Sequence, residues 1–139
     1  MTKYIFVYGT LMKCTPPNKW SKILHNNSTF IGDAYVIGEM FNINWFPGLV
    51  AGDKKVYGEV YEIKNNDIYV DLDDYEDYHA DDEKSSLFVR KVTIATLVES
   101  GKELEVSAYY YNKVVNPYNK ITTGKFTDFL EKVETLQKK

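Results

Sequence analysis

Five segments rich in β-branched and aromatic residues, each bounded by turn residues, limit the folds that this chain can adopt. They are Lys3–Tyr8, Thr29–Trp45, Val56–Ile63, Leu87–Val98 and Glu103–Tyr111. Thr29–Trp45 is interrupted near Gly38 and forms one or two strands. Phe46-Pro47-Gly48 predicts the turn that follows, and Glu99-Ser100-Gly101-Lys102 predicts a hairpin between the last two segments.

Short helices are expected around these strands. Asn18 is a suitable N-cap for a helix over Lys19–Leu24, and Asn65-Asn66-Asp67 precedes a short helix that runs to about Glu76. Apolar residues at helical spacing predict a last helix over Lys125–Leu136. We therefore expect a single domain over residues 1–139 with an α+β fold. Its core is a small, partly open, mixed or antiparallel β-barrel with short flanking helices.

Composition excludes several classes of function. Twenty acidic and 17 basic side chains give a net charge of -3 without a basic stripe, which argues against a nucleic-acid partner. No apolar run is long enough to span a membrane, so we expect a cytoplasmic protein. Cys14 is the single cysteine, and we interpret it as a small loop residue rather than a nucleophile. His25 and His79 have no paired metal spacing, so we expect no metal site. The 12 tyrosines suit a polar pocket for a small ligand.

The first strand ends in Tyr8-Gly9-Thr10-Leu11. A glycine after a strand can take φ values that are closed to other residues, so that the turn exposes successive backbone N–H groups and binds an anion. Taken alone, the pattern equally describes an ordinary strand end. Neither a GxxxxGK[ST] nor a GxGxxG pattern is present, so a nucleotide phosphate loop is not supported.

The most acidic stretch, Asp71–Glu83, lacks the glycine that a calcium-binding EF-hand loop needs at its sixth place. On a helical wheel Asp73, Asp74 and Asp77 face water, whereas Glu76 lies at the flank of the apolar face. Partial burial and neighbouring negative charges would raise the pKa of Glu76, as a proton shuttle requires. The alternative is a boundary glutamate whose carboxylate reaches into solvent.

Several short segments occur together in the order of a known family. They are Phe6–Leu11 (FVYGTL), Phe46–Val50 (FPGLV), Gly58–Ile63 (GEVYEI), Leu72–Tyr78 (LDDYEDY), Phe88–Ile94 (FVRKVTI) and Asn116–Phe126 (NPYNKITTGKF). Each is short, but their joint presence over about residues 4–125 resembles the gamma-glutamylcyclotransferase-like family, including the gamma-glutamylamine cyclotransferases.

The resemblance implies a partly open barrel and an enzyme that releases 5-oxoproline and a free amine from a small gamma-glutamyl substrate, without a cofactor. It implies that Glu76 is the catalytic general base and acid. The implied substrate-binding residues are Tyr8, Gly9, Thr10, Leu11 and Tyr118. Asp77 stands where the family usually has glycine, which bears on pocket shape.

Two other interpretations stay open. One is a non-catalytic binding or interaction module on the same fold, which a pocket blocked by Asp77 or by the acidic loop would favour. This acidic loop, Asp81-Asp82-Glu83-Lys84, differs from the short link expected from the resemblance. The other is a protein-binding surface of exposed tyrosines. Arg90 either offsets negative charge near the site or is an exposed cross-strand partner of an acidic side chain.

Overall fold

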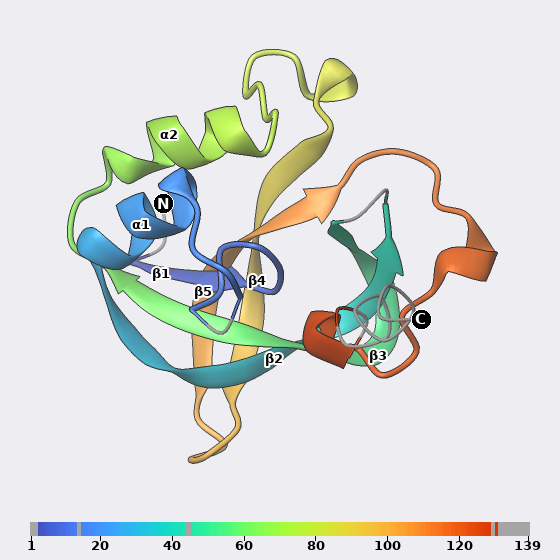
Figure 1. The fold of residues 1–139 in the computed structure, drawn as a ribbon, viewed down its shortest axis with the longest axis horizontal. Helices are drawn as coiled ribbons and strands as arrows, with labels where there is room; N and C mark the ends of the chain where they lie inside the picture. The colour runs from blue at the N-terminus through green and yellow to red at the C-terminus, as the bar shows by residue number, and fades with distance from the viewer. Residues whose placement is uncertain (1–2, 14, 44–45, 129, 131–139) are drawn as a thin grey trace.

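Five strands close into a β-barrel in the order β1-β3-β2-β4-β5, as Figure 1 shows. The computed structural model describes residues 3–13, 15–43, 46–128 and 130. The strands are β1 (Tyr4–Val7), β2 (Ser28–Asn42), β3 (Pro47–Ile63), β4 (Phe88–Leu97) and β5 (Glu103–Tyr111). The predicted α+β class with a small mixed barrel is confirmed, and the ring of strands closes.

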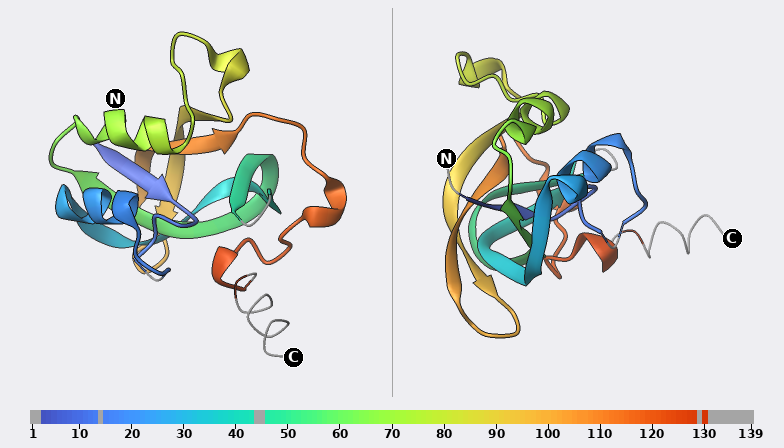
Figure 2. Two further views of the ribbon diagram at one scale, coloured as in Figure 1. Left: turned by 45° about the horizontal axis from the view of Figure 1, so that its top comes forward. Right: turned by 90° about the vertical axis from the view of Figure 1, so that its left-hand side faces the viewer.

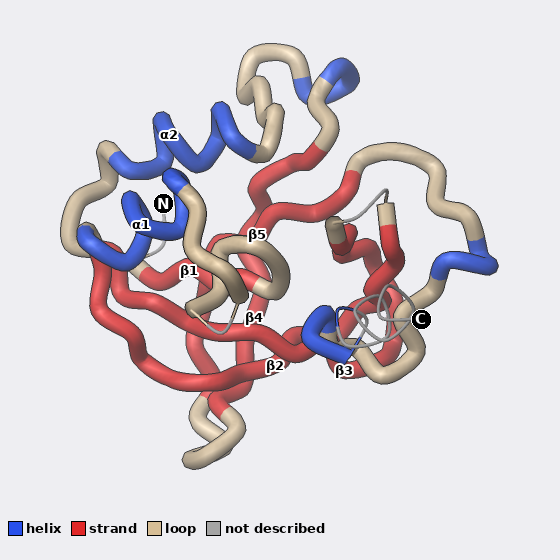
Figure 3. The backbone as a smooth tube through the Cα atoms, viewed as in Figure 1, coloured by secondary structure: helices blue, strands red, loops and turns tan. Residues whose placement is uncertain are grey.

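Strands that stand next to one another in this order run antiparallel, whereas the strand pairs that close the barrel run parallel. Strand β1 pairs with β5 at Ile5 and Ser107, and β3 pairs with β5 at Leu49 and Tyr110. Long strands make this closure possible, because β2 and β3 bend far enough to form more than one side of the barrel (Figure 3). The interruption expected near Gly38 is a register shift within one continuous strand, not a break between two.

The turn between β2 and β3 lies earlier than the sequence suggested. The backbone N–H of Ile43 donates to the carbonyl of Phe46 at 2.7 Å, and β3 already begins at Pro47. The expected strand Val56–Ile63 is therefore only the second half of β3. Proline is tolerated at the first residue of a strand, where its missing N–H costs no ladder bond, so the prediction of a turn at Phe46-Pro47-Gly48 was wrong.

Two helices, α1 (Lys19–Asn26) and α2 (Ile68–Tyr75), lie side by side against one part of the barrel (Figures 1 and 2). Asn18 caps α1 as predicted, and it forms a reciprocal capping box with Ser21. Asp67, the N-cap of α2, makes no side-chain cap bond. Instead Asn65 Oδ1 accepts from the N–H of Asp67 at 3.0 Å, which shapes the approach to the helix.

The remaining elements are short. Two 3-10 turns, η1 (Glu83–Ser85) and η2 (Pro117–Asn119), follow α2 and β5 respectively. Residues 126–128 and 130 of the predicted last helix are helical, and Lys125 precedes them outside the helix. The other residues of that prediction, 129 and 131–136, lie outside the described residues, as does Cys14. No helix in the described part of the chain is long and apolar enough to cross a membrane. The fully buried core includes Ile5, Phe6, Leu72, Val60 and Val106.

Candidate active site

The turn after β1 consists of Gly9, Thr10 and Leu11, and its backbone N–H groups have no acceptor among the described residues. All three of its carbonyls are bonded within the protein: Gly9 O to the N–H of Met12 at 3.0 Å, Thr10 O to Asn18 Nδ2 at 2.9 Å, and Leu11 O to His25 Nε2 at 2.9 Å. The amides of Gly9, Thr10 and Leu11 have no acceptor among the described residues. In a trans peptide the N–H points opposite to the preceding carbonyl. Because the carbonyl of Thr10 points to α1, the N–H of Leu11 points away from it.

Gly9 is required by a close approach, not by an unusual φ. The described glycines with positive φ are Gly101 and Gly124, so the proposed access of Gly9 to closed φ values was wrong. A Cβ built on Gly9 would lie 2.6 Å from Pro47 Cγ, closer than any real contact of this kind. The absence of a side chain therefore lets the turn pack directly on the first residue of β3.

Two further side chains fix this turn. The hydroxyl of Tyr8 donates to the carbonyl of Tyr109 at 2.6 Å and accepts from the N–H of Leu49 at 3.1 Å. Burial raises the pKa of Tyr8, so the phenol stays protonated. Next to the turn, the buried carboxylate of Glu59 accepts from the N–H of Lys13 at 2.8 Å. The turn is thus tied to strands on both sides and is rigid before any ligand binds.

Glu76 is the residue that ends α2, where it serves as C-cap. Its side chain is half-buried, and among the described residues no hydrogen-bond or ion-pair partner holds its carboxyl group. Burial, and secondarily the nearby negative charge of Asp73, raise the pKa of Glu76 to about 8. A glutamate of this kind exchanges its proton near neutral pH, as general acid–base chemistry requires.

One cavity of about 270 Å³ joins the turn to Glu76. A cavity of this size holds a small molecule rather than a folded partner. Its walls are Phe6, Val7, Tyr8, Gly9, Thr10, Leu11, Phe46, Pro47, Tyr75, Glu76, Leu87, Phe88 and Tyr109. The structure therefore brings together five of the six predicted site residues, namely Tyr8, Gly9, Thr10, Leu11 and Glu76.

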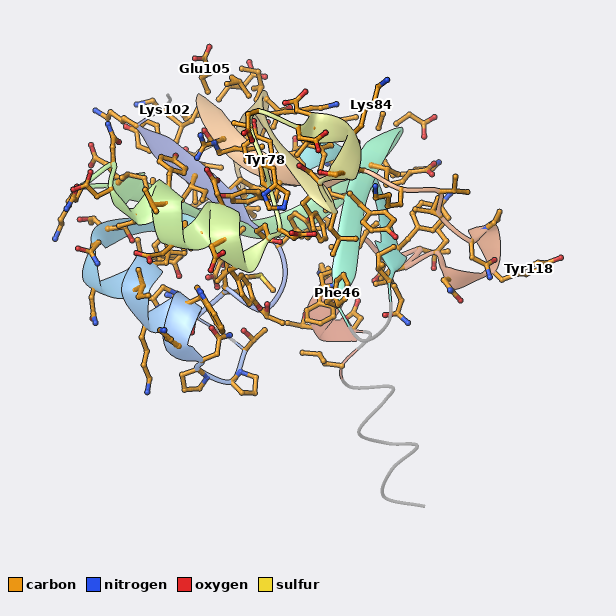
Figure 4. All side chains as sticks on the ribbon, turned by 90° about the horizontal axis from the view of Figure 1, so that it is seen from above. Phe46, Tyr78, Lys84, Lys102, Glu105 and Tyr118 are labelled. Atoms are coloured by element: carbon orange, nitrogen blue, oxygen red, sulfur yellow. The ribbon has the colours of Figure 1, made fainter. Side chains whose placement is uncertain are left out.

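Tyr118 is the predicted site residue that the structure does not bring to this cavity. Its side chain is 95% exposed and lines a different hollow, beside η2. Figure 4 shows it pointing outward at the far end of the molecule, whereas Phe46 lies near the middle. Tyr118 follows β5 in the sequence, but the intervening segment carries it away from Glu76.

A half-buried ion pair between Arg90 and Asp73 adjoins Glu76. Arg90 Nη1 lies 2.9 and 3.1 Å from the two carboxylate oxygens of Asp73, and the hydroxyl of Tyr109 donates to Asp73 Oδ1 at 2.6 Å. The Arg90 guanidinium also stands 4.3 Å from the centre of the Tyr69 ring. The placement of Asp73 in water was therefore wrong, and Arg90 offsets charge near the site instead of being exposed. The helical wheel could not show this, because both partners come from β4 and β5.

Asp77 does not obstruct the cavity. Its φ of 54° lies in the left-handed region that favours glycine, the residue expected at this position from the resemblance. Aspartate tolerates this conformation, and here its Oδ1 lies 2.8 Å from His79 Nε2 on the surface. Asp74 is exposed as predicted. Aspartate in place of glycine at position 77 therefore keeps the left-handed backbone turn and leaves the cavity open.

Sequence reasoning missed several lining residues. Thr10 Oγ1 and Tyr75 Oη lie 2.5 Å apart, which links the turn to the end of α2. Tyr75 in turn stacks on Trp20 with ring centroids 4.6 Å apart. The segments containing Phe46 and Phe88 were recognised as motifs, but nothing in them indicated that these residues line the same cavity as Glu76. Within the described residues, no three His, Cys, Asp or Glu side chains meet in a way that could hold a metal ion.

Comparison with known proteins gives a consistent result. The family model described as "Gamma-glutamyl cyclotransferase, AIG2-like" matches residues 5–128. A Drosophila melanogaster protein named "Putative gamma-glutamylcyclotransferase" is 29% identical over 141 residues, which cover 86% of this chain and 87% of that protein. A Methanocaldococcus jannaschii protein with the same name is 30% identical over 115 residues, covering 78% and 84% of the two chains.

Solved structures agree on the fold. An uncharacterized protein from Pyrococcus horikoshii matches with a TM-score of 0.64 at 18% identity, over 95% of this chain and 96% of that one. An AIG2-like protein from Mus musculus matches with a TM-score of 0.63 at 21% identity, over 85% and 82% of the two chains. At these identities the likeness concerns the arrangement of strands and helices.

Proposed function

Because this chain belongs to the gamma-glutamyl cyclotransferase, AIG2-like family, we propose that it is a cyclotransferase acting on a gamma-glutamyl amine or a related gamma-glutamyl compound. The products are 5-oxoproline and a free amine. The observation that carries the proposal is that Glu76 and the open amides of the turn line one cavity, where the half-buried carboxyl group of Glu76 has no partner among the described residues. A cytoplasmic location stays a prediction.

The reaction needs proton movement more than a new nucleophile. The substrate's own α-amine attacks its γ-carbonyl carbon, the new C–N bond closes a five-membered ring, and the old amide C–N bond breaks. The α-ammonium group gives up one proton before it attacks, and the same nitrogen gives up a second proton once the ring C–N bond has formed. The departing nitrogen gains one proton as it leaves and a second when the free amine becomes an ammonium group in water. A single carboxyl group that accepts a proton from the α-nitrogen and donates one to the departing nitrogen serves both steps.

The raised pKa of Glu76 suits this role. Moving a proton from the substrate's α-ammonium group, whose pKa is at least about 8, to an ordinary carboxylate would cost at least about 5 kcal/mol. With the pKa of Glu76 at about 8, that cost is lower by about 5 kcal/mol. The protonated Glu76 is then still acidic enough to supply the departing amide nitrogen. General acid–base catalysis of this kind contributes roughly 10²- to 10⁴-fold.

The turn supplies the complementary half of the site. We infer that the open amides of Gly9, Thr10 and Leu11 bind the substrate's α-carboxylate, while the Tyr8 ring packs against the glutamyl carbons. Main-chain donors with no side-chain freedom bind an anion at low entropic cost. Anchoring the carboxylate there, with the α-amine beside Glu76, would fold the substrate onto itself. Effective molarities for such preorganised reactions reach about 10⁵ M or more.

The test is to incubate the protein with a panel of gamma-glutamyl amines and to follow 5-oxoproline by mass spectrometry. Glu76→Gln should still bind substrate, and its turnover should fall by at least about 100-fold because the amide cannot accept a proton. Asp74→Asn, which removes an exposed carboxylate from the same helix, is the matched control and should keep the parent rate. Unchanged turnover in Glu76→Gln would remove this residue from the mechanism.

Failure to form 5-oxoproline from any member of the panel would instead favour a binding module on the same fold. The present geometry gives that alternative no specific support. Neither Asp77 nor the acidic loop Asp81–Lys84 is among the described residues that line the cavity, so neither blocks it there.

A further inference from the structure

Asn18 connects the turn after β1 to helix α1 through both ends of its side-chain amide. Its Oδ1 accepts from the N–H of Ser21 at 2.8 Å, which caps the helix. Its Nδ2 donates to the carbonyl of Thr10 at 2.9 Å. The backbone N–H of Asn18 in turn donates to Ser21 Oγ at 2.8 Å. One half-buried side chain thus belongs to the helix and to the turn at once.

A short carboxamide meets both requirements at position 18, and other capping side chains do not. The N–H of Ser21 needs an acceptor and the carbonyl of Thr10 needs a donor, and a carboxamide presents one of each on two different atoms. Aspartate caps a helix as well as asparagine does, but it offers no donor when ionised. Serine caps through a single hydroxyl oxygen on a shorter side chain. Helix capping alone therefore does not account for asparagine at this position.

The bond to Thr10 sets the direction of the next backbone donor. The carbonyl of Thr10 and the N–H of Leu11 belong to one planar trans peptide and point in opposite directions. Because Asn18 holds the carbonyl toward α1, the N–H of Leu11 faces away from α1, where it has no acceptor among the described residues. Leu11 also lines the cavity that contains Glu76. Rotation of this one peptide would withdraw the donor and leave Glu76 in place.

Other contacts hold the rest of the turn and leave this peptide to Asn18. The carbonyls of Gly9 and Leu11 have partners of their own, at 3.0 and 2.9 Å. Among the described residues, the carbonyl of Thr10 is bonded to Asn18 only. Loss of the Asn18 donor would therefore free one peptide plane and not the whole turn.

From this geometry we propose that Asn18 is a positioning residue for the substrate's α-carboxylate, and that it directs the N–H of Leu11 toward this anion through the carbonyl of Thr10. The inference rests on the proposed function, in which the open amides of the turn bind that carboxylate. Asn18 does not line the cavity, so its effect passes through the peptide that joins Thr10 to Leu11. A ligand that lacks the carboxylate should therefore be insensitive to Asn18.

Two ligands isolate the contribution of the carboxylate. The product 5-oxoproline keeps the α-carboxylate of the substrate, and 2-pyrrolidinone is the same ring without it. Each is titrated into isotope-labelled protein at about pH 6.5, where Glu76, with a pKa of about 8, holds its proton and does not repel the anion. In the parent protein, NMR should show 5-oxoproline binding at least about 10-fold more tightly than 2-pyrrolidinone and shifting the amide resonances of Gly9, Thr10 and Leu11.

Asn18→Asp and Asn18→Ser keep a capping side chain but remove the donor to Thr10. Each should weaken the binding of 5-oxoproline by about 10-fold or more, as expected for one hydrogen bond to a charged group, and change that of 2-pyrrolidinone by less than about 2-fold. The amide resonance of Leu11 should no longer respond to 5-oxoproline. Asn18→Asp should show the larger loss, because its carboxylate repels the carbonyl of Thr10 and attracts the N–H of Leu11. The loss in the neutral Asn18→Ser shows that added charge is not the cause.

Ser21→Ala is the matched control. It removes the other side chain of the capping box and leaves both partners of the Asn18 amide in place. We expect it to lower the midpoint of urea denaturation, because the N–H of Asn18 loses its acceptor, while its affinity for 5-oxoproline stays within about 2-fold of the parent value. The two Asn18 variants should show the opposite pattern, with little change in stability and a large change in affinity.

The outcomes separate this inference from the function on which it rests. If no gamma-glutamyl amine yields 5-oxoproline and 5-oxoproline does not bind, the proposed function fails, and the inference fails with it. If 5-oxoproline forms but the turn does not respond to it, or its affinity is unchanged in both Asn18 variants, the function holds and the positioning role is wrong. Equal losses for 5-oxoproline and 2-pyrrolidinone, or an equal loss in Ser21→Ala, would show that Asn18 only supports the fold.

Discussion

Replacing Glu76 should make the stability of the protein respond differently to pH. The folded state holds the pKa of Glu76 at about 8, against 4.5 for an ordinary glutamate such as that of the unfolded chain. Between these two values the folded protein binds one proton more than the unfolded chain. The free energy of unfolding must therefore fall as pH rises from 4.5 to about 8, and it changes little from this source outside that window.

The size of the effect follows from the same two values. One pKa unit corresponds to about 1.4 kcal/mol, so the full loss from pH 4.5 to above 8 is about 5 kcal/mol. The loss is about 0.8 kcal/mol at pH 5 and about 3.3 kcal/mol at pH 7. The glutamine side chain in Glu76→Gln does not titrate, so the free energy of unfolding of the variant lacks this decrease with pH. Relative to the parent protein, the variant should therefore gain about 2.5 kcal/mol between pH 5 and pH 7.

Urea denaturation at a series of pH values between 4.5 and 8.5 measures this difference. Asp74→Asn, from the same helix, shows how much of any change follows from losing one exposed negative charge. Glu76→Gln also changes the free energy of unfolding by an amount that does not depend on pH. Comparing the difference between variant and parent at two pH values removes that constant amount. A difference between parent and Glu76→Gln that stays within about 0.5 kcal/mol over the whole range would refute the raised pKa, and with it the argument for a shared proton.

Three further predictions concern neighbours of Glu76 and the turn. Asp73→Asn removes the negative charge that helps to raise the pKa of Glu76, so the acidic limb of the kcat/KM profile should move to lower pH, and an unmoved limb would contradict the coupling. Gly9→Ala forces a methyl group against Pro47 and should lower the free energy of unfolding by about 1–3 kcal/mol, measured by urea denaturation. Asp77→Gly relieves a left-handed φ and should raise that free energy by about 0.5–1 kcal/mol with turnover unchanged; a loss of activity would mean that the Asp77 side chain acts in the site.

Local physics accounts for what the sequence predicted well. The Asn18 cap depends on residues three apart, the hairpin over Glu99–Lys102 depends on four consecutive residues, and the flank position of Glu76 depends on one helical turn. Each of these features is determined within about ten residues of chain, so pattern and propensity suffice. The prediction of a turn at Phe46-Pro47-Gly48 was wrong because pairing of Pro47 and Gly48 with β2 overrode the local preference of proline and glycine for a turn.

Contacts between distant segments account for what the sequence did not predict. Asp73 faces Arg90 and Tyr109 because the barrel brings β4 and β5 beside α2, and a helical wheel contains no information about that neighbour. Tyr118 is far from Glu76 for the same reason, since its position depends on the path of the chain after β5.

Local sequence patterns were sufficient to predict four of the strands, the second half of β3, the capped helix and a glutamate at the edge of an apolar face, because each depends on neighbours along the chain. Tertiary structure alone decided that this glutamate shares a cavity with the open amides after β1, and that Asp73 is bonded to Arg90 and Tyr109. These outcomes depend on strand register and barrel closure, which join residues many positions apart through contacts that no local pattern encodes.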